Sequence, residues 1–279
     1  MKSRLILLFS CAAIAFALAQ ETSVTDITEN ENFEGFSLND QLEKALENLK
    51  KQMPCGFPDH GVPPLAPYKR VYTEIQHEHA LYSILLNLFD LQVDGLNDFR
   101  TNAVTMSVLT MKGTFDINFN NVLAKSQYKM NFFPINLLRI TGEGDLNFQL
   151  KDLRVKGDFQ LGIKDKGLAL KSFNIVVVLG DCNSNISNLL GGGIAGRLAN
   201  KAIERFVKFF IKTQSRFISD TLREKIVTIV NEKLQDYTIK DLLDIIASAQ
   251  KPPTCVPPPD TQVNQLDLLL KLLEITKLE

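Results

Sequence analysis

Hydrophobic and polar residues alternate through the middle of the chain, from Asn102 to Gly180. Apolar residues occupy every second position in short series, which are separated by glycines, by Pro134 and by the stretch 164–167. Because successive side chains of a strand point to opposite faces, a period of two predicts strands with one apolar face. We expect a long, bent antiparallel meander, either half of a β-sandwich or a sheet curled around a helix.

The parity of this alternation changes once near its start. Val104, Met106 and Val108 share one parity, whereas the series that begins at Phe115 has the other, and Gly113 lies between them. A change of parity at a glycine is typical of a bulge or bend within a strand. The sequence therefore predicts one long strand that bends near Gly113.

A helical period follows the predicted sheet. After the glycine run 191–193, apolar residues recur at three- and four-residue spacing from Ile194 to residue 232, without a proline. A helix of about forty residues would be about 60 Å long, and a highly curved sheet could provide a partner of that length. The alternatives are an ordinary core helix, or two helices that separate at the polar run 212–216.

Shorter elements flank these two regions. Ser37 can cap a helix, with Asp40 three positions later, and the proline-rich segment 54–67 ends it. Residues 241–249 carry a second short helical pattern. The apolar segment 81–91 is compatible with both a helix and buried extended chain, and its pattern does not decide between them.

The chain divides into four predicted segments. Residues 1–19 have the basic start, apolar core and small-residue cleavage site of a signal peptide. An acidic leader over 20–36 precedes one main domain over 37–250. Residues 251–279 form a proline-rich spacer and an amphipathic tail helix, which could dock on its own domain, on a protein partner or on a lipid surface.

The cysteines and one sequon suggest modifications typical of the secretory route. Cys11 lies within the predicted signal peptide, and oxidising compartments favour a bridge among the others. We predict one internal disulfide that uses Cys255, with either Cys55 or Cys182 as its partner, because spacing alone cannot choose. Asn185 begins an Asn-Ile-Ser sequon and is a candidate for glycosylation.

Composition and motifs argue against several functional classes. The formal net charge is −1, with no basic cluster suited to nucleic acid. The chain has no nucleophile elbow, no His-Glu-x-x-His and no phosphate-binding loop. His77 and His79 form a close pair without an evident third metal ligand, so surface positions are expected for both. We predict no catalytic residue, no metal and no cofactor.

The order of several short motifs resembles the insect takeout and juvenile-hormone-binding family. These motifs are the Gly61-Val62-Pro63-Pro64-Leu65 loop, the turn at 93–99, Phe133-Pro134 and Gly142-Glu143-Gly144, followed by the long helix. The resemblance covers residues 37–249. It implies an α+β fold of the tubular lipid-binding superfamily, in which a long, highly curved antiparallel sheet wraps around one long α-helix with flanking N- and C-terminal helices. It also implies a tunnel for an isoprenoid or fatty ligand.

The aromatic residues suggest where such a ligand would bind. The chain has 18 phenylalanines and no tryptophan, and rings on a curved sheet and on its helix can border an apolar cavity. The alternative is a solid core in which the same rings interdigitate. The predicted ligand-binding residues are Phe115, Phe119, Phe132, Phe148, Phe206 and Phe210.

The sequence thus favours a secreted, extracellular, non-enzymatic carrier of a small hydrophobic ligand such as an isoprenoid or fatty acid. The second hypothesis is an extracellular lipid-surface or innate-immune binding protein that acts through exposed apolar helices. An esterase-like enzyme ranks last, since no catalytic constellation supports it.

Overall fold

A computed structural model describes residues 37–57, 62–134, 139–165 and 167–256. The predicted signal peptide, the acidic leader and the tail helix lie outside the described residues, as does His60. The division of the chain into four segments therefore stays a prediction.

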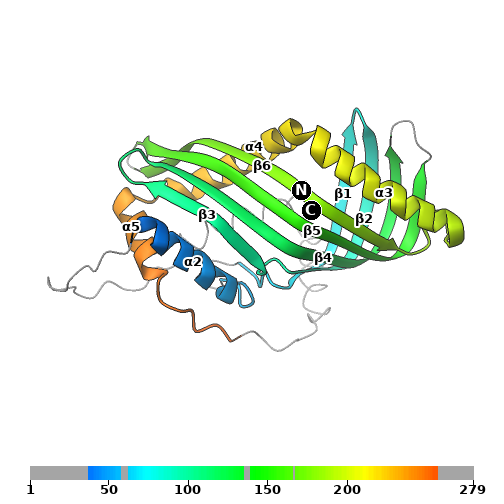
Figure 1. Ribbon diagram of the computed structural model, residues 1–279, viewed down its shortest axis with the longest axis horizontal. Helices are drawn as coiled ribbons and strands as arrows, with labels where there is room; N and C mark the ends of the chain where they lie inside the picture. Colours follow the sequence, from blue (N-terminus) through cyan, green and yellow to red (C-terminus); the bar gives the residue numbers. More distant parts are fainter. Residues whose placement is uncertain (1–36, 58–61, 135–138, 166, 257–279) are drawn as a thin grey trace, which may run out of the picture.

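Six antiparallel strands form one long curled sheet (Figure 1). Their order across the sheet is β1-β2-β4-β5-β6, and β3 pairs with the first part of β4. The strands are β1 (Tyr68–His79), β2 (Tyr82–Asp94), β3 (Phe99–Ser107), β4 (Lys112–Pro134), β5 (Ile140–Lys164) and β6 (Gly167–Ile186). Strands β2 and β3 occupy consecutive stretches of one β4 edge, with Gly95 in the turn between them at φ 84°. This architecture confirms the predicted fold class.

The sheet extends further towards the N-terminus than the alternation indicated. It begins at Tyr68 instead of Asn102, and the ambiguous segment 81–91 is extended chain within β2. The predicted bend near Gly113 is wrong, because the two parities belong to separate strands of a hairpin. That hairpin turns at residues 108–111, where Leu109 is almost fully exposed and Met111 has a φ of 54°.

The long helical segment is two helices with a bend between them. Helix α3 (Gly193–Thr213) follows a short 3-10 turn, η2 (Leu189–Gly191), and α4 (Ser215–Leu234) begins after Gln214. The Thr213 hydroxyl donates to the Phe209 carbonyl, a local bond that bends helices. Helical backbone hydrogen bonds continue through the bend, because the Gln214 amide donates to the Phe210 carbonyl and the Gln214 carbonyl accepts from the Ile218 amide. The alternative of a split within 212–216 therefore describes this segment.

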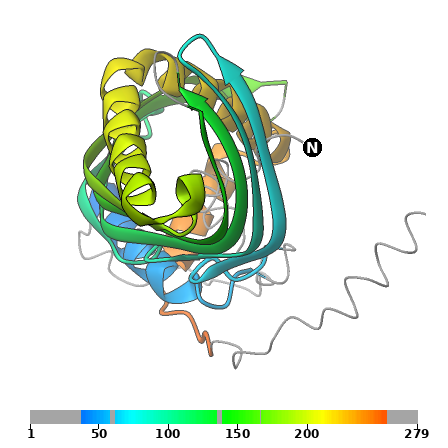
Figure 2. The same cartoon turned by 90° about the vertical axis from the view of Figure 1, so that its right-hand side faces the viewer.

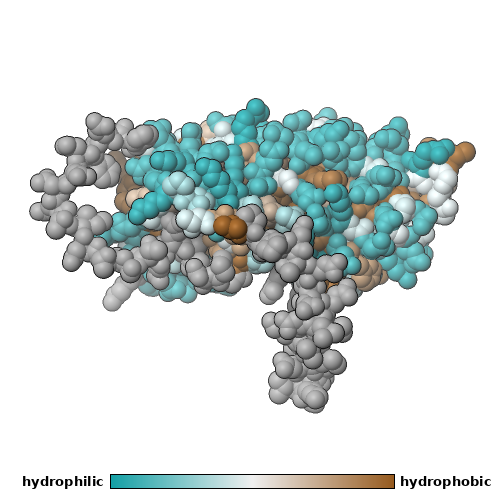
Figure 3. All heavy atoms as spheres, turned by 90° about the horizontal axis from the view of Figure 1, so that it is seen from below, coloured by the Kyte–Doolittle hydropathy of each residue, from teal (hydrophilic) through white to brown (hydrophobic). Residues whose placement is uncertain are grey.

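Both helices lie along the β6 edge of the sheet. Around the curl, the strands follow the order β6, β5, β4, β2 and β1, so that β6 and β1 form its two edges. Helices α3 and α4 lie across the space between these two edges (Figure 2). The face seen in Figure 3 is largely hydrophilic. Apolar side chains of all six strands gather on the inner face of the curl, the inward face, where they form two hydrophobic clusters.

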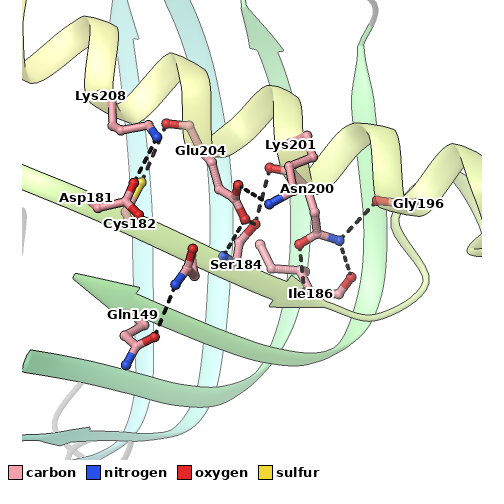
Figure 4. A network of polar contacts seen from close by, with 11 residues as sticks. Gln149, Asp181, Cys182, Ser184, Ile186, Gly196, Asn200, Lys201, Glu204 and Lys208 are labelled. Atoms are coloured by element: carbon pink, nitrogen blue, oxygen red, sulfur yellow. Dashed lines mark hydrogen bonds and ion pairs between the residues drawn. The ribbon is translucent and has the colours of Figure 1, made fainter. Parts of the chain in front are cut away.

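A polar network fixes α3 to β6 (Figure 4). Glu204 is 5% exposed, and its carboxylate accepts from the Ser184 backbone amide at 2.8 Å and from Lys201 Nζ at 2.7 Å. Asn200 bonds both backbone groups of Ile186. These bonds satisfy buried polar groups that would otherwise destabilise the fold, so they set the position of α3 along the strand.

The opposite end of the curled sheet is covered by α2 (Leu38–Gln52) and α5 (Ile239–Ser248) (Figure 1). Helix α2 begins with the expected cap, in which Ser37 and Asp40 form a reciprocal capping box. Of the two pairings left open for Cys255, the structure contains the disulfide with Cys55, with a Cα–Cα distance of 5.9 Å. Cys182 is a buried free thiol, whose pKa burial raises. No described helix is long and apolar enough to cross a membrane.

In the neighbouring strands β2, β4, β5 and β6, the alternation of inward and outward side chains shifts by one residue. The shifts in β4, β5 and β6 lie side by side across the sheet. Asp90 in β2 and Asp152 in β5 adopt left-handed conformations with φ near 50°, and residues on either side of each break face the same interior. Gly180 allows the close approach at this level, since a Cβ there would lie 2.8 Å from the Cβ of Asp152. The inward pairs that span the break are Leu88 and Leu91, Phe119 and Val122, Leu150 and Leu153, and Leu179 and Cys182.

Candidate ligand cavity

The curled sheet and its helices surround a partly open cavity of about 1310 Å³. This exceeds the roughly 300–1,000 Å³ of ordinary small-molecule sites. Its wall is mainly aliphatic and aromatic and includes side chains from every strand and from α2, α3, α4 and α5. A long chain or more than one small guest would therefore fit the volume. A second pocket of about 660 Å³ has a lining rich in polar residues.

The six phenylalanines expected at a ligand site all line this cavity. Phe115, Phe119 and Phe132 extend from β4 and Phe148 from β5, while α3 contributes the last two. Some of these rings also touch one another: the centroids of Phe132 and Phe206 are 5.0 Å apart. All six rings nevertheless border the open volume of the cavity. Their role in binding a ligand stays a proposal.

An aromatic cluster joins the β1–β2 hairpin to the bend between the helices. His79 lies 4.7 Å from Phe217 and 5.6 Å from Phe210, measured between ring centroids. Tyr82 contacts Phe206 at 5.5 Å, and burial raises the pKa of its hydroxyl, which keeps that group protonated. The cluster closes the seam between the two edges of the sheet at this level. His77 is exposed, as expected, whereas His79 is half-buried; both rings pack against Phe217, and His79 Nδ1 accepts the Leu81 amide at 3.1 Å.

Sequence reasoning missed several polar side chains of the wall. Arg70 and Thr73 extend from β1, and Thr221 and Lys225 extend from α4. Lys225 could have been found, because it follows Ile218 by seven positions and Leu222 by three and so falls on the apolar stripe of its helix. The sequence pattern around Arg70 does not predict that its side chain faces the cavity, because this orientation depends on the shift in alternation at Asp90.

The described residues contain no group of three or more His, Cys, Asp or Glu placed to hold a metal ion. The most strongly perturbed carboxyl lies outside the cavity wall: Asp116 bonds to Arg154, which lowers its pKa to about 2. Asn185 is exposed on β6, and the Ser187 hydroxyl of its sequon accepts the Asp145 amide at 2.7 Å. Glycosylation there stays a prediction.

Comparison with known proteins gives a family match over most of the chain. Residues 5–244 match the family described as haemolymph juvenile hormone binding protein (JHBP). No curated protein matches the sequence. Among solved structures, the crystal structure of Epiphyas postvittana Takeout 1 is 16% identical, covers 70% of this chain and 93% of its own, and has a TM-score of 0.49.

A second similar structure is that of a lipopolysaccharide binding protein. It is 12% identical, with a TM-score of 0.29, and the match covers 59% of this chain and 33% of that protein.

Proposed function

Because this chain belongs to the haemolymph juvenile hormone binding protein family, we propose that it is an extracellular, non-enzymatic carrier that holds a small hydrophobic ligand in its interior cavity. The predicted resemblance to the takeout and juvenile-hormone-binding group agrees with that membership. The observation that carries the proposal is the large apolar volume inside the curled sheet. Apolar cavities of this kind exclude water and accept hydrophobic guests.

The rings of the wall support a ligand with an extended apolar body. Phe115 lines the part of the cavity near α4, whereas Phe132 and Phe206 line the part beneath α3. The volume therefore runs past both hydrophobic clusters of the domain. A chain-like lipid, such as a fatty acid or an isoprenoid, would contact rings along its length and bury most of its surface.

Binding of the neutral fluorophore N-phenyl-1-naphthylamine tests the proposal directly. The purified protein should bind it saturably, and native mass spectrometry should detect the complex. Ala124 lines the cavity, so Ala124→Phe should fill part of the volume and weaken binding at least several-fold. Ala103→Phe is the matched control, because Ala103 is exposed on β3 and lies outside the wall. Folded wild-type protein without saturable binding would refute the carrier proposal.

A further inference from the structure

Among the described residues, the inward face of the cavity wall carries two cationic side chains and no carboxylate. Arg70 pairs in register with Leu91, which is 2% exposed and belongs to the core, so both face the interior. Lys225 lies on α4 and lines the same cavity. Both cations are half-buried, and neither has an ion pair within the described part of the chain.

Glu74 is the one carboxylate among the described residues that line the cavity, but its side chain faces away from the interior. It pairs with Asn87, between the inward residues Leu86 and Leu88 of β2, and therefore has outward parity. The Tyr72 hydroxyl donates to Glu74 on that exposed face at 3.3 Å. Glu74 thus leaves the inward cations without a counter-charge.

An unpartnered hydroxyl lies in the same region. Thr73 Oγ1 is buried and has no hydrogen-bond partner among the described residues. Thr73 pairs with Leu88 on the inward face and lines the cavity. A buried hydroxyl without a partner is unfavourable, so a polar atom of a guest would stabilise it.

These side chains come from two elements on opposite sides of the seam. Strand β1 is one edge of the sheet, and α4 packs on β6, the other edge. Figure 2 shows β1 curling towards the helices. At the hairpin tip His77 already approaches Phe217 of α4, with ring centroids 6.2 Å apart. Thr221 and Lys225 follow Phe217 by one and two turns of α4, and Thr73 and Arg70 precede His77 by four and seven positions on β1, so the polar side chains lie on the two elements that meet at this tip.

We propose that the natural ligand is a long-chain amphiphile with a carboxylate head, a fatty acid, whose head lies against the polar wall residues of β1 or α4 and whose chain lies along the phenylalanine-lined cavity. The inference rests on the proposed carrier function and specifies its ligand. Cations in a low-dielectric wall are costly without a counter-charge. A carboxylate would form charge-assisted hydrogen bonds with Arg70 or Lys225 and accept a hydrogen bond from Thr73, whereas a neutral ester supplies no charge.

Displacement of N-phenyl-1-naphthylamine by hexadecanoic acid and by methyl hexadecanoate separates the two ligand classes. Wild-type protein should bind the acid at least about tenfold more tightly than the ester, since hydrogen bonds to charged groups contribute about 1.5–3 kcal/mol and 1.4 kcal/mol is tenfold. The double variant Arg70→Met, Lys225→Met should lose that preference and keep its affinity for the fluorophore and the ester. Thr73→Val should lower the affinity for the acid, but not for the ester, by a smaller factor than the double variant does.

Lys233→Met is the matched control, because Lys233 is exposed on α4 and outside the wall. It should leave all three affinities unchanged. Equal affinity of wild-type protein for acid and ester, or equal weakening of both in the double variant, would overturn the carboxylate proposal while fluorophore binding still supports the carrier. Absence of fluorophore, acid and ester binding to folded protein would overturn both proposals.

Discussion

The side-chain amide of Asn48 donates a 2.7 Å hydrogen bond to the carbonyl of Ala249, which lies 201 positions later in the chain. The same amide reaches the Lys251 carbonyl at 3.2 Å, and Asn48 is 3% exposed. A second bond runs from Gln250 Nε2 to the Gln41 carbonyl at 2.8 Å. Helices α2 and α5 are therefore joined where they cover one end of the curled sheet.

Asn48→Leu should lower the free energy of unfolding by about 1–3 kcal/mol, because a buried carbonyl loses its donor. Denaturant unfolding measures the change. Lys51→Leu, at an exposed position of the same helix, should have little effect. If both variants unfold at the same denaturant concentration as wild-type protein, the bond contributes nothing to closing this end.

The Cys55–Cys255 disulfide joins the same two regions, with a sequence separation of 200. Cys255→Ser should cost about 2–5 kcal/mol, since the bridge restricts a long loop in the unfolded chain. Thermal unfolding should show a lower Tm that dithiothreitol no longer changes, whereas dithiothreitol should lower the Tm of wild-type protein. Non-reducing peptide mapping that finds Cys255 as a free thiol would contradict the pairing.

Phe206 and Phe99 distinguish a cavity wall from a filled core. Phe206 borders the cavity, whereas Phe99 is 7% exposed, packs against Phe119 and is not in the wall. Phe99→Ala should cost about 3–5 kcal/mol and leave the affinity for N-phenyl-1-naphthylamine unchanged. Phe206→Ala should cost less and change that affinity. The reverse pattern would show that the ring of Phe206 fills a solid core.

Glu204 should make stability depend on pH. Burial alone would raise the pKa of this carboxyl, but hydrogen bonds from Lys201 and Ser184 outweigh burial and lower it. A lowered pKa in the folded state means that the ionised carboxylate stabilises the fold. That contribution is complete above the unfolded value of about 4.3 and disappears as the pH falls through the lower folded value.

Glu204→Gln should therefore lower the Tm most near pH 7 and approach wild-type behaviour at the acid end of a pH 7 to pH 3 series. Other carboxyls with lowered pKa values, such as Asp181, add to the acid sensitivity of both proteins, so the difference between the two curves is the relevant quantity. Glu143→Gln serves as the control, since that side chain is 75% exposed. A constant difference at all pH values would contradict the assignment.

The sequence by itself determined the class of this fold and the residues of its apolar interior. The period of two placed Phe115 and Phe119 on one face of a strand, and the helical period placed Phe206 and Phe210 on one stripe, because each backbone geometry fixes the direction of its side chains locally. The helix cap at Ser37 could also be predicted from the sequence, because it depends only on residues within one turn.

Tertiary structure decided what local periodicity cannot encode. The pairing of Cys255 with Cys55 and the bond between Asn48 and Ala249 depend on how α2 and α5 meet in space. The left-handed residue Asp90 reverses parity within β2, and the pairing of β1 with β2 carries that reversal to Arg70, which therefore faces the cavity. The charge of the wall, and with it the proposed preference for a carboxylate, follows from this register because only folding brings distant strands together.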